Sequence, residues 1–287
     1  MPFPLSRGGS NVIAEVQRWQ YFLLKQGFLQ VGPIDGDFGL NTETATKFFQ
    51  VKVGVSSTGA LDRDTLAAAG ALGYKILPDN HYRKLSEKTF PEEPEDLTSP
   101  SNESRNRDFG CFKFVQLPRA QRPDAEAIVI RGRCDASAPD WVASSIVSME
   151  VPQLKFARGF GGRIRCHTRA APIIKALFEK WEAEDLLHLI MSYEGCFVPR
   201  YKRRQAPPGS SGHGEKKSSN VPKLSNHSFG SAFDINFTDN QLGEEPARCG
   251  MRGSVRELVA AANSLGVFWG GHFGTKDGMH FEISKLT

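Results

Sequence analysis

The stretch LSNHSFGSAFDINF, Leu224–Phe237, joins a polar segment to a run of alternating apolar residues. After Gly230 the side chains alternate with a period of two, which predicts a β-strand with one face toward a core. Asp234 would then point to the opposite face, and His227 would fold back over it from the preceding loop. The apolar members of the alternation are Phe233, Ile235 and Phe237.

A second segment near the C-terminal end, KDGMHFEIS, has the same pattern. His280 and Glu282 would face one way on a strand, away from its apolar residues. If the two predicted strands are neighbours, His227, Asp234 and His280 converge on one open face. The apolar residues of the second strand are Met279, Phe281 and Ile283.

Two histidines and one carboxylate suit a catalytic zinc ion, which takes three protein ligands and keeps a fourth position for water. We therefore expect His227, Asp234 and His280 to bind zinc. Hydrolysis also needs a base that takes a proton from water, and Asp277 lies three residues before His280. Glu282 is either the alternative base or a partner that orients an imidazole ligand.

Residues 8–72 predict a small module of three helices. The first helix has apolar residues at helical spacing and ends at Gly27, and a PIDGDFGLNT turn follows it. Asn41 or Thr42 would cap the second helix, and Asp62 would cap the third. The apolar face predicted for the second helix is Ala45, Phe48, Phe49 and Val53.

The rest of the chain divides into a linker and a larger domain. Residues 73–107 are rich in proline, serine and charge, which predicts a flexible linker. Residues 108–287 mix strands and helices without βαβ regularity, which predicts an α+β domain with an antiparallel sheet. Within this domain we expect a strand at HLIMSYEG, helices at AAPIIKALFEKWEAE and GSVRELVAAANSLG, and a mobile loop over residues 203–223.

The charge and hydropathy of the chain limit the classes of partner that we expect. The net charge of +4 favours anionic polymers such as cell-wall material or nucleic acid. No basic stripe with RNA-binding aromatic residues occurs, so we expect no nucleic-acid partner. The longest apolar runs are too short for a membrane span, and the first residues lack the pattern of a signal peptide. We expect a monomer that is made in the cytoplasm.

Five widely spaced cysteines do not form a CxxC motif or a disulfide framework. Buried thiols are the favoured interpretation, with one bridge left open for an oxidising compartment. His167 and His188 lie in a region of helix and strand, where we expect structural roles.

The N-terminal module resembles the peptidoglycan-binding three-helix domain. The resemblance covers nearly all of the module and implies that it holds the cell wall while the linker keeps the second domain nearby. It rests on Gln17, Leu24, Gly27, the segment IDGDFGLNT, Ala45, the FFQ segment, Gly54 and the segment GALDRDTL.

The C-terminal domain resembles zinc peptidases that include D-alanyl-D-alanine carboxypeptidases and the L-alanyl-D-glutamate endopeptidases of phage lysins. The motifs SxHxxGxAxD, WGG and DxxHFE occur in that order, and the resemblance covers roughly residues 140–287. The matching positions are Ser225, His227, Gly230, Ala232 and Asp234, then Trp269, Gly270, Gly271, Asp277, His280, Phe281 and Glu282.

The resemblance implies roles for further residues. The segment YEGCFVPR resembles one that supplies an arginine, so Arg200 would bind a substrate carboxylate or steady the oxyanion, and Ser225 and Trp269 would line the substrate site. Because PRYKRR is a run of cations, a solvated face is the other interpretation of Arg200, and Arg203 is the next choice. His272 stands where the family often has an acidic residue. Its role is left open among ligand support, substrate contact and packing.

Both resemblances point to the same polymer. They imply a zinc-dependent peptidoglycan peptidase, anchored by its first domain, that needs no acyl-enzyme. The carboxypeptidase branch usually has Glu at the position of Asp277, so the aspartate favours cleavage between L-alanine and D-glutamate. A D,D-carboxypeptidase or another stem-peptide endopeptidase is the alternative, and a non-catalytic wall-binding protein with a structural zinc is the alternative of another class. A lysin, a secreted toxin and a host wall enzyme all fit, the first two with a partner for release or delivery. We therefore expect the protein to act on the wall or in the periplasm after release or secretion.

Overall fold

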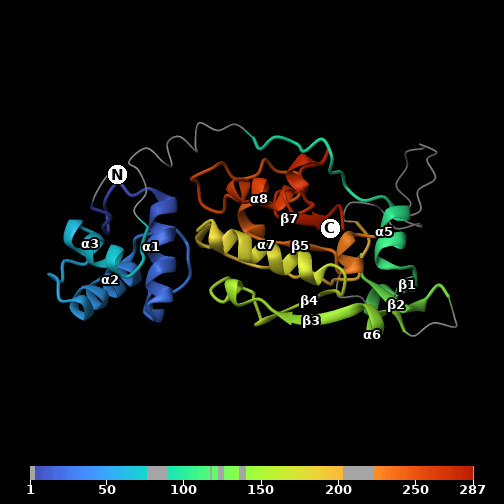
Figure 1. Ribbon diagram of the computed structural model, residues 1–287, viewed down its shortest axis with the longest axis horizontal. Helices are drawn as coiled ribbons and strands as arrows, with labels where there is room; N and C mark the ends of the chain where they lie inside the picture. Colours follow the sequence, from blue (N-terminus) through green and yellow to red (C-terminus); the bar gives the residue numbers. More distant parts are fainter. Residues whose placement is uncertain are drawn as a thin grey trace.

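The computed structural model places a helical N-terminal module beside a larger C-terminal unit (Figure 1). The predicted linker residues 76–89 and nearly all of the predicted loop, residues 203–222, lie outside the described residues. No helix in the described part of the chain is long and apolar enough to cross a membrane. The structure describes residues 4–75, 90–116, 118–121, 126–135, 140–202 and 223–286.

The N-terminal module consists of three helices, as predicted: α1 (Ile13–Lys25), α2 (Leu40–Val53) and α3 (Arg63–Ala71). Its centre is the fully buried Trp19, which lies 5.4 Å from the rings of Phe22 and Phe49. The apolar spacing of α1 therefore builds the core of the module. A single 3-10 turn, η1 (Leu29–Val31), follows α1.

Helix capping in the module agrees with the sequence at one helix and differs at another. The Asp62 side chain accepts the Thr65 N–H and caps α3, as predicted. Helix α2 instead begins after Gly39, with no side-chain cap among the described residues. Thr42 is used elsewhere, because its hydroxyl accepts a hydrogen bond from Gln20. Phe48, predicted on the apolar face, is exposed.

The C-terminal unit is α+β, as predicted, with three small antiparallel sheets in the described ranges. They are β1 (Phe112–Gln116) with β2 (Ile128–Arg133), β3 (Ile146–Glu150) with β4 (Arg163–His167), and β5 (Ala232–Asp234), β7 (His280–Ile283) and β6 (Val267–Trp269) in the order β5-β7-β6. The helices are α5 (Asn102–Phe109), α6 (Trp141–Ser145), α7 (Ala171–Ala183) and α8 (Val259–Asn263).

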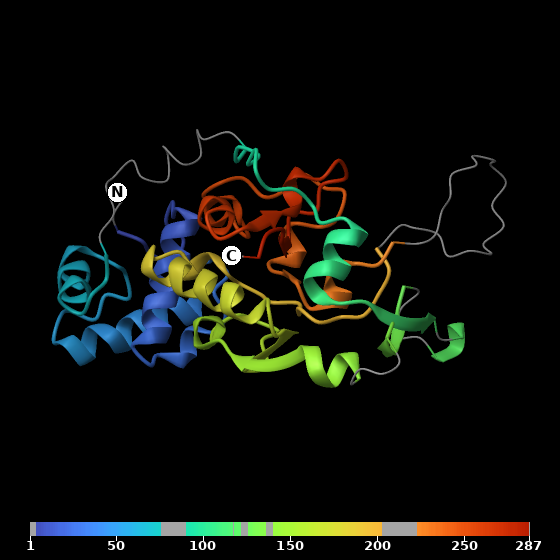
Figure 2. The ribbon, with the colours of Figure 1, turned by 45° about the vertical axis from the view of Figure 1, so that its right-hand side comes forward.

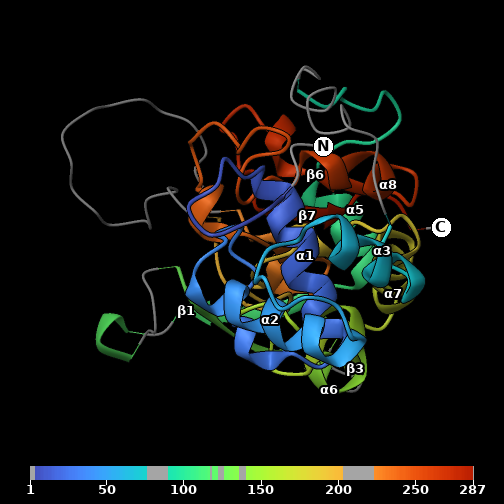
Figure 3. The ribbon, with the colours of Figure 1, turned by 90° about the vertical axis from the view of Figure 1, so that its left-hand side faces the viewer.

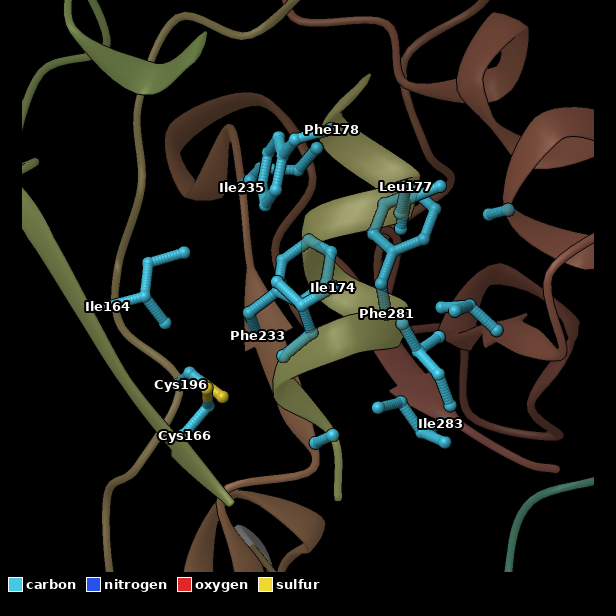
Figure 4. Close-up of a cluster of buried hydrophobic side chains, with 14 of the residues drawn as sticks. Ile164, Cys166, Ile174, Leu177, Phe178, Cys196, Phe233, Ile235, Phe281 and Ile283 are labelled. Atoms are coloured by element: carbon cyan, nitrogen blue, oxygen red, sulfur yellow. The ribbon is translucent and has the colours of Figure 1, made fainter. Parts of the chain in front are cut away.

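Helix α7 and the third sheet form the core that supports the site. Phe178 packs 5.6 Å from Phe233 of β5, and Trp181 packs 5.6 Å from Phe281 of β7. Figure 4 shows these strands against the helix, with Ile174 and Leu177 on the same face. The apolar side of the two motif strands therefore faces inward, and their polar side is turned away from this core.

One predicted strand is shorter than expected and another is replaced by a turn, and one residue, Asn236, accounts for both. Asn236 adopts a left-handed conformation, with φ of 55°, so β5 ends at Asp234 and Phe237 is 40% exposed rather than in the core. The Asn236 amide oxygen accepts the backbone N–H groups of Met191 and Ser192. In place of the strand predicted at HLIMSYEG, this segment forms the turn η4 (Leu187–Leu189) and isolated bridges.

The helix predicted at GSVRELVAAANSLG is broken into the 3-10 turn η7 (Arg256–Leu258) and α8. Ser254 and Glu257 have the spacing of a capping box, which predicts a cap at the start of this helix, but the box does not form. The Ser254 hydroxyl instead donates to the Glu257 carboxylate, which also accepts the Gly250 N–H. This pair closes the preceding loop rather than extending a helix.

Residues 90–107 lie on the C-terminal domain, which differs from the flexible linker expected there. The Phe90 ring packs 5.1 Å from Trp269, with the Lys276 ammonium 4.5 Å from its centre. Helix α5 begins within the segment and buries Arg105. The average composition of the segment suggested a linker, but the side chains of Phe90 and Arg105 hold it against the C-terminal domain.

One disulfide joins Cys111 to Cys134 across the β1–β2 hairpin. This corrects the preference for thiols at those two positions and uses the bridge that the sequence left open. The other cysteines, Cys166, Cys196 and Cys249, are buried thiols, as expected.

Figures 1, 2 and 3 show the N-terminal module beside the C-terminal unit from three sides. The module contacts this unit through α1 and η4. The Arg18 guanidinium lies 2.7 Å from the Asp185 carboxylate, and its side chain is buried. The Tyr21 and Phe156 rings meet edge to face at 5.9 Å. The contact therefore combines an ion pair with an aromatic contact.

Candidate metal centre

Two neighbouring strands and one turn bring the expected ligands together. Strands β5 and β7 pair with Asp234 opposite His280, as the alternating patterns predicted. His227 belongs to the 3-10 turn η5 (Asn226–Phe229), which ends at Gly230 with φ of 64°. A Cβ at Gly230 would lie 2.7 Å from a backbone nitrogen of β4, so glycine lets η5 lie close to the sheet.

Three ligand atoms form a compact triangle. His227 Nε2 lies 3.1 Å from Asp234 Oδ1 and 3.1 Å from His280 Nδ1, and His280 Nδ1 lies 2.9 Å from Asp234 Oδ1. Zinc ligands at about 2.0–2.1 Å from a tetrahedral ion are roughly 3.3 Å apart. The three atoms therefore need to separate only slightly to hold an ion.

The partners of the outer ring nitrogens orient both imidazoles. His227 Nδ1 lies 3.1 Å from the Cys196 carbonyl, and His280 Nε2 lies 2.9 Å from a carboxylate oxygen of Glu282. A carbonyl and a carboxylate only accept, so the hydrogens of the neutral rings belong on these outer nitrogens. The inner nitrogens then present lone pairs, together with Asp234, to a common point. This donor set suits a cation.

Electrostatics favours the same conclusion. Burial alone would raise the pKa of Asp234, but both histidines hold it well below its usual range. Burial lowers the pKa of His227 and keeps that ring neutral. Burial also opposes charge on His280, yet hydrogen bonds to Asp234 and Glu282 outweigh it and raise its pKa to about 10. A metal ion would therefore displace one proton from His280.

A cleft of about 590 Å³ borders the triangle, and a hollow of about 210 Å³ lies beside it. Arg200 lines both, and its guanidinium lies 3.8 Å from the Asp234 carboxylate with 11% of the side chain exposed. The solvated-face interpretation of Arg200 is therefore wrong, whereas Arg203 lies outside the described residues. His280, Asp277, Glu282, Ser225 and His272 also line the larger cleft.

Asp277 lies in the turn that precedes β7. Its N–H donates to the Gly270 carbonyl at 2.9 Å, and its own carbonyl accepts the His280 N–H at 3.1 Å. These bonds hold the Asp277 backbone next to one metal ligand, on the wall of the cleft. Glu282, in contrast, is fully buried against His280. That position suits orientation of a ligand better than contact with substrate.

Trp269 does not lie where a substrate contact would require. It is fully buried, its indole N–H donates to the Gly278 carbonyl at 2.8 Å, and it borders neither cavity at the centre. The WGG motif identifies the turn but does not show that Trp269 is buried. We therefore correct the assignment of Trp269 to the substrate site: its side chain supports the turn that carries Asp277.

Ser225 and His272 have more local roles. The Ser225 hydroxyl accepts the His227 N–H at 3.4 Å at the start of η5, so it supports the turn that carries a ligand. His272 packs on Phe90 and Trp269, and burial lowers its pKa. Of the three roles left open for His272, packing at the cleft wall is the one that its contacts support.

Three groups around the centre were missed from the sequence: the Cys196 carbonyl, the Asn226 amide and the Arg105 guanidinium. Asn226 donates to Glu282, and Arg105 donates to Asn226 at 2.8 Å. Asn226 could have been found from the sequence, because it directly precedes a predicted ligand. The Cys196 carbonyl and Arg105 could not, because a backbone carbonyl has no sequence signature and Arg105 lies in the predicted linker.

Comparisons with protein families agree with this geometry. Residues 219–283 match the family described as D-alanyl-D-alanine carboxypeptidase, and this segment contains all three ligands. Residues 13–69 match the peptidoglycan binding domain. The two matches together support a peptidase that acts on peptidoglycan. They match the two resemblances drawn from the sequence, in the same order along the chain. No curated protein and no solved structure matched the chain.

Proposed function

We propose that this chain is a zinc-dependent peptidoglycan hydrolase that cuts the stem peptide between L-alanine and D-glutamate. The observation that carries the proposal is the triangle of His227, Asp234 and His280, whose lone pairs converge at a cleft that also contains Asp277. The family match and the wall-binding module support peptidoglycan as the polymer.

The residues divide the chemistry among them. His227, Asp234 and His280 hold the ion, which supplies Lewis acidity toward water and a peptide carbonyl. Asp277 takes the proton of the attacking water and passes it to the leaving amine. Glu282 and the Cys196 carbonyl keep the imidazoles oriented.

Arg200 provides a positive charge in the cleft that a carboxylate of the stem peptide would contact. Its guanidinium lines the cleft beside Asp234 and suits bidentate contact with a carboxylate of the substrate. Ser225 lines the same cleft. We assign substrate binding to Arg200, with Ser225 as a neighbouring polar contact.

A second candidate is a D,D-carboxypeptidase, which the description of the matched family favours. Mass spectrometry of fragments released from purified sacculi separates the two. Cleavage between L-alanine and D-glutamate leaves a new N-terminal D-glutamate, whereas a carboxypeptidase releases free D-alanine. Release of D-alanine alone would replace the proposed bond by the second candidate.

A chelator experiment tests the alternative of a non-catalytic wall-binding protein with a structural zinc. We expect fragment release to stop with chelator and to return with added zinc. His280→Ala should abolish both release and bound metal, because two remaining ligands hold zinc poorly. Full zinc occupancy in His280→Ala would show that the ligand assignment is wrong, and sacculi left uncut by zinc-loaded wild type would favour the non-catalytic protein.

We also propose that the protein acts on the cell wall outside the cytoplasm. The Cys111–Cys134 disulfide supports an oxidising compartment. A monomeric state and a partner that releases or delivers the protein remain predictions from the sequence.

A further inference from the structure

Helix α5 lies outside both matched segments, yet it contacts η5, the turn that carries His227. The helix begins at Asn102, with Ser101 as its cap, and presents Arg105 to the C-terminal domain. Arg105 is only 1% exposed, so its charge is withdrawn from water. A buried guanidinium needs acceptors, and its acceptors identify what it does.

Each described hydrogen-bond acceptor for Arg105 is an oxygen atom. Nη1 donates to the Leu224 carbonyl at 2.5 Å and to the Asn226 Oδ1 at 2.8 Å. Nη2 donates to the Asn102 Oδ1. The guanidinium also lies over the Phe229 ring, 5.3 Å from its centre. Asn226 and Phe229 belong to η5, the turn that carries His227, and Leu224 lies two residues before that turn.

The bond to Asn226 determines how this side chain is oriented. Because Oδ1 accepts from Arg105, the Nδ2 group points the other way and donates to the Glu282 carboxylate. The same Glu282 oxygen accepts the outer N–H of His280 at 2.9 Å. A continuous chain of hydrogen bonds therefore runs from Arg105 through Asn226 and Glu282 to a metal ligand.

We propose that Arg105 is a positioning residue for the metal centre, which holds Asn226 so that Glu282 keeps the inner nitrogen of His280 directed at the ion. This inference rests on the proposed function, since it takes the triangle to be a metal site. It makes Arg105 a support of the metal centre rather than part of a linker.

The test measures metal affinity in the full-length chain, separately from cleavage. Zinc Kd is obtained by competition with a chromogenic chelator, and the geometry of the centre is read from the visible bands of bound Co²⁺. Arg105→Met removes the donors and keeps most of the side-chain volume. Loss of such outer partners costs about 10–100-fold in metal affinity, and we expect about 10-fold here together with shifted cobalt bands.

Arg107→Met is the matched control, because Arg107 lies on the same helix with its side chain 73% exposed and pairs with Asp108. It should leave Kd and the cobalt spectrum unchanged. A folded Arg105→Met protein with wild-type Kd and spectrum overturns the proposal, even if its Tm is lower, because a purely structural role would produce that result.

Asn102→Ala provides a milder variant in case Arg105→Met does not fold. It removes one acceptor of the guanidinium at the exposed start of α5. We expect a smaller increase in Kd in the same direction, and an unchanged Kd would then overturn the proposal. A wild-type protein that binds no zinc would fail the proposed function instead, so the two failures are distinguishable.

Discussion

His227 and His280 face the centre with different ring nitrogens, Nε2 and Nδ1. Each therefore needs its own partner on the far side of the ring, and the partners differ in charge. The neutral Cys196 carbonyl holds one ring, and the Glu282 carboxylate holds the other. A carboxylate partner makes its imidazole the more basic ligand. The two histidines would thus be unequal ligands of the proposed ion, and His280 depends on a longer set of contacts.

Asp277 and Glu282 should separate chemistry from metal binding. Asp277→Asn is nearly isosteric, so zinc should remain bound, while loss of a general base lowers the rate of stem-peptide cleavage by about 10²–10⁴-fold. Glu282→Gln should instead weaken zinc binding by about 10–100-fold, because the amide orients His280 less well. Cleavage rates at saturating zinc and the zinc Kd of each variant check both expectations.

Zinc-loaded wild type is the control for both variants. If Asp277→Asn cleaves normally at saturating zinc while Glu282→Gln does not, the two roles are exchanged. Normal cleavage by both variants would mean that the hydrolytic mechanism is different.

The convergence of His280 and Asp234 could be predicted from the sequence because alternation on a strand places both on the same face in any register that keeps Phe233 and Phe281 inside. Their supports could not. Arg105 reaches Asn226 from a distant part of the chain, and nothing local marks that contact. A motif also conceals burial, which is why Trp269 was assigned to the substrate.

Short elements depend on single polar residues more than on periodicity. The left-handed Asn236 ends β5 and occupies the hydrogen-bonding groups that a longer strand at residues 190–194 would need. Helix α5 forms in a segment of linker-like composition because one arginine and one phenylalanine, Arg105 and Phe109, are buried. Strong apolar periodicity predicted α1 and α7, whereas these elements follow from contacts distant in sequence.

His167 at the end of β4 should make the fold sensitive to acid. Its Nε2 lies 3.0 Å from the Phe109 carbonyl and its Nδ1 accepts the Arg169 N–H, so the ring is neutral with both nitrogens used. Burial lowers its pKa to about 4, from an ordinary value near 6.5. The unfolded chain therefore binds more protons between these values, and the stability contributed by the neutral ring falls as the pH drops through that window.

The variant His167→Gln tests this dependence, since glutamine does not titrate. Thermal unfolding of metal-free protein, measured from pH 7 to about pH 4, should show a smaller loss of Tm in His167→Gln than in wild type. Equal losses would assign the acid sensitivity to other groups.

At the scale of the whole molecule, the two units form a contact that the sequence did not reveal. Composition predicted a tether, but Arg18 of α1 is buried against Asp185, which lies between α7 and η4. Sequence shows that α1 has an apolar face. It does not show that a polar residue of the same helix faces another domain.

Asp185→Asn should loosen this contact. Asparagine tolerates the left-handed backbone at this position, where φ is 61°, so the substitution removes charge without new strain. Losing a charged hydrogen bond costs about 1.5–3 kcal/mol, which makes opening of the contact at least about 10-fold more frequent. Hydrogen exchange at α1 and η4 should increase accordingly, while cleavage of soluble stem peptides is unchanged.

Glu179→Gln is the matched neutralisation for this experiment, because Glu179 is an exposed carboxylate on α7. Faster exchange at α1 in this control as well would attribute the effect to net charge rather than to the contact. Unchanged exchange in Asp185→Asn would show that the aromatic contact of Tyr21 and Phe156 is sufficient.

The docking of α1 on η4 makes the offset between the wall-binding module and the metal centre a property of the fold. A loose tether would let the catalytic unit sample every bond within its reach, with a probability set by chain length. A rigid offset selects only bonds at one displacement and one orientation from the anchoring point. A hydrolase of this kind would cut bonds at a fixed distance from its anchoring point. The stem peptides that lie closer to that point would stay intact until the protein moved.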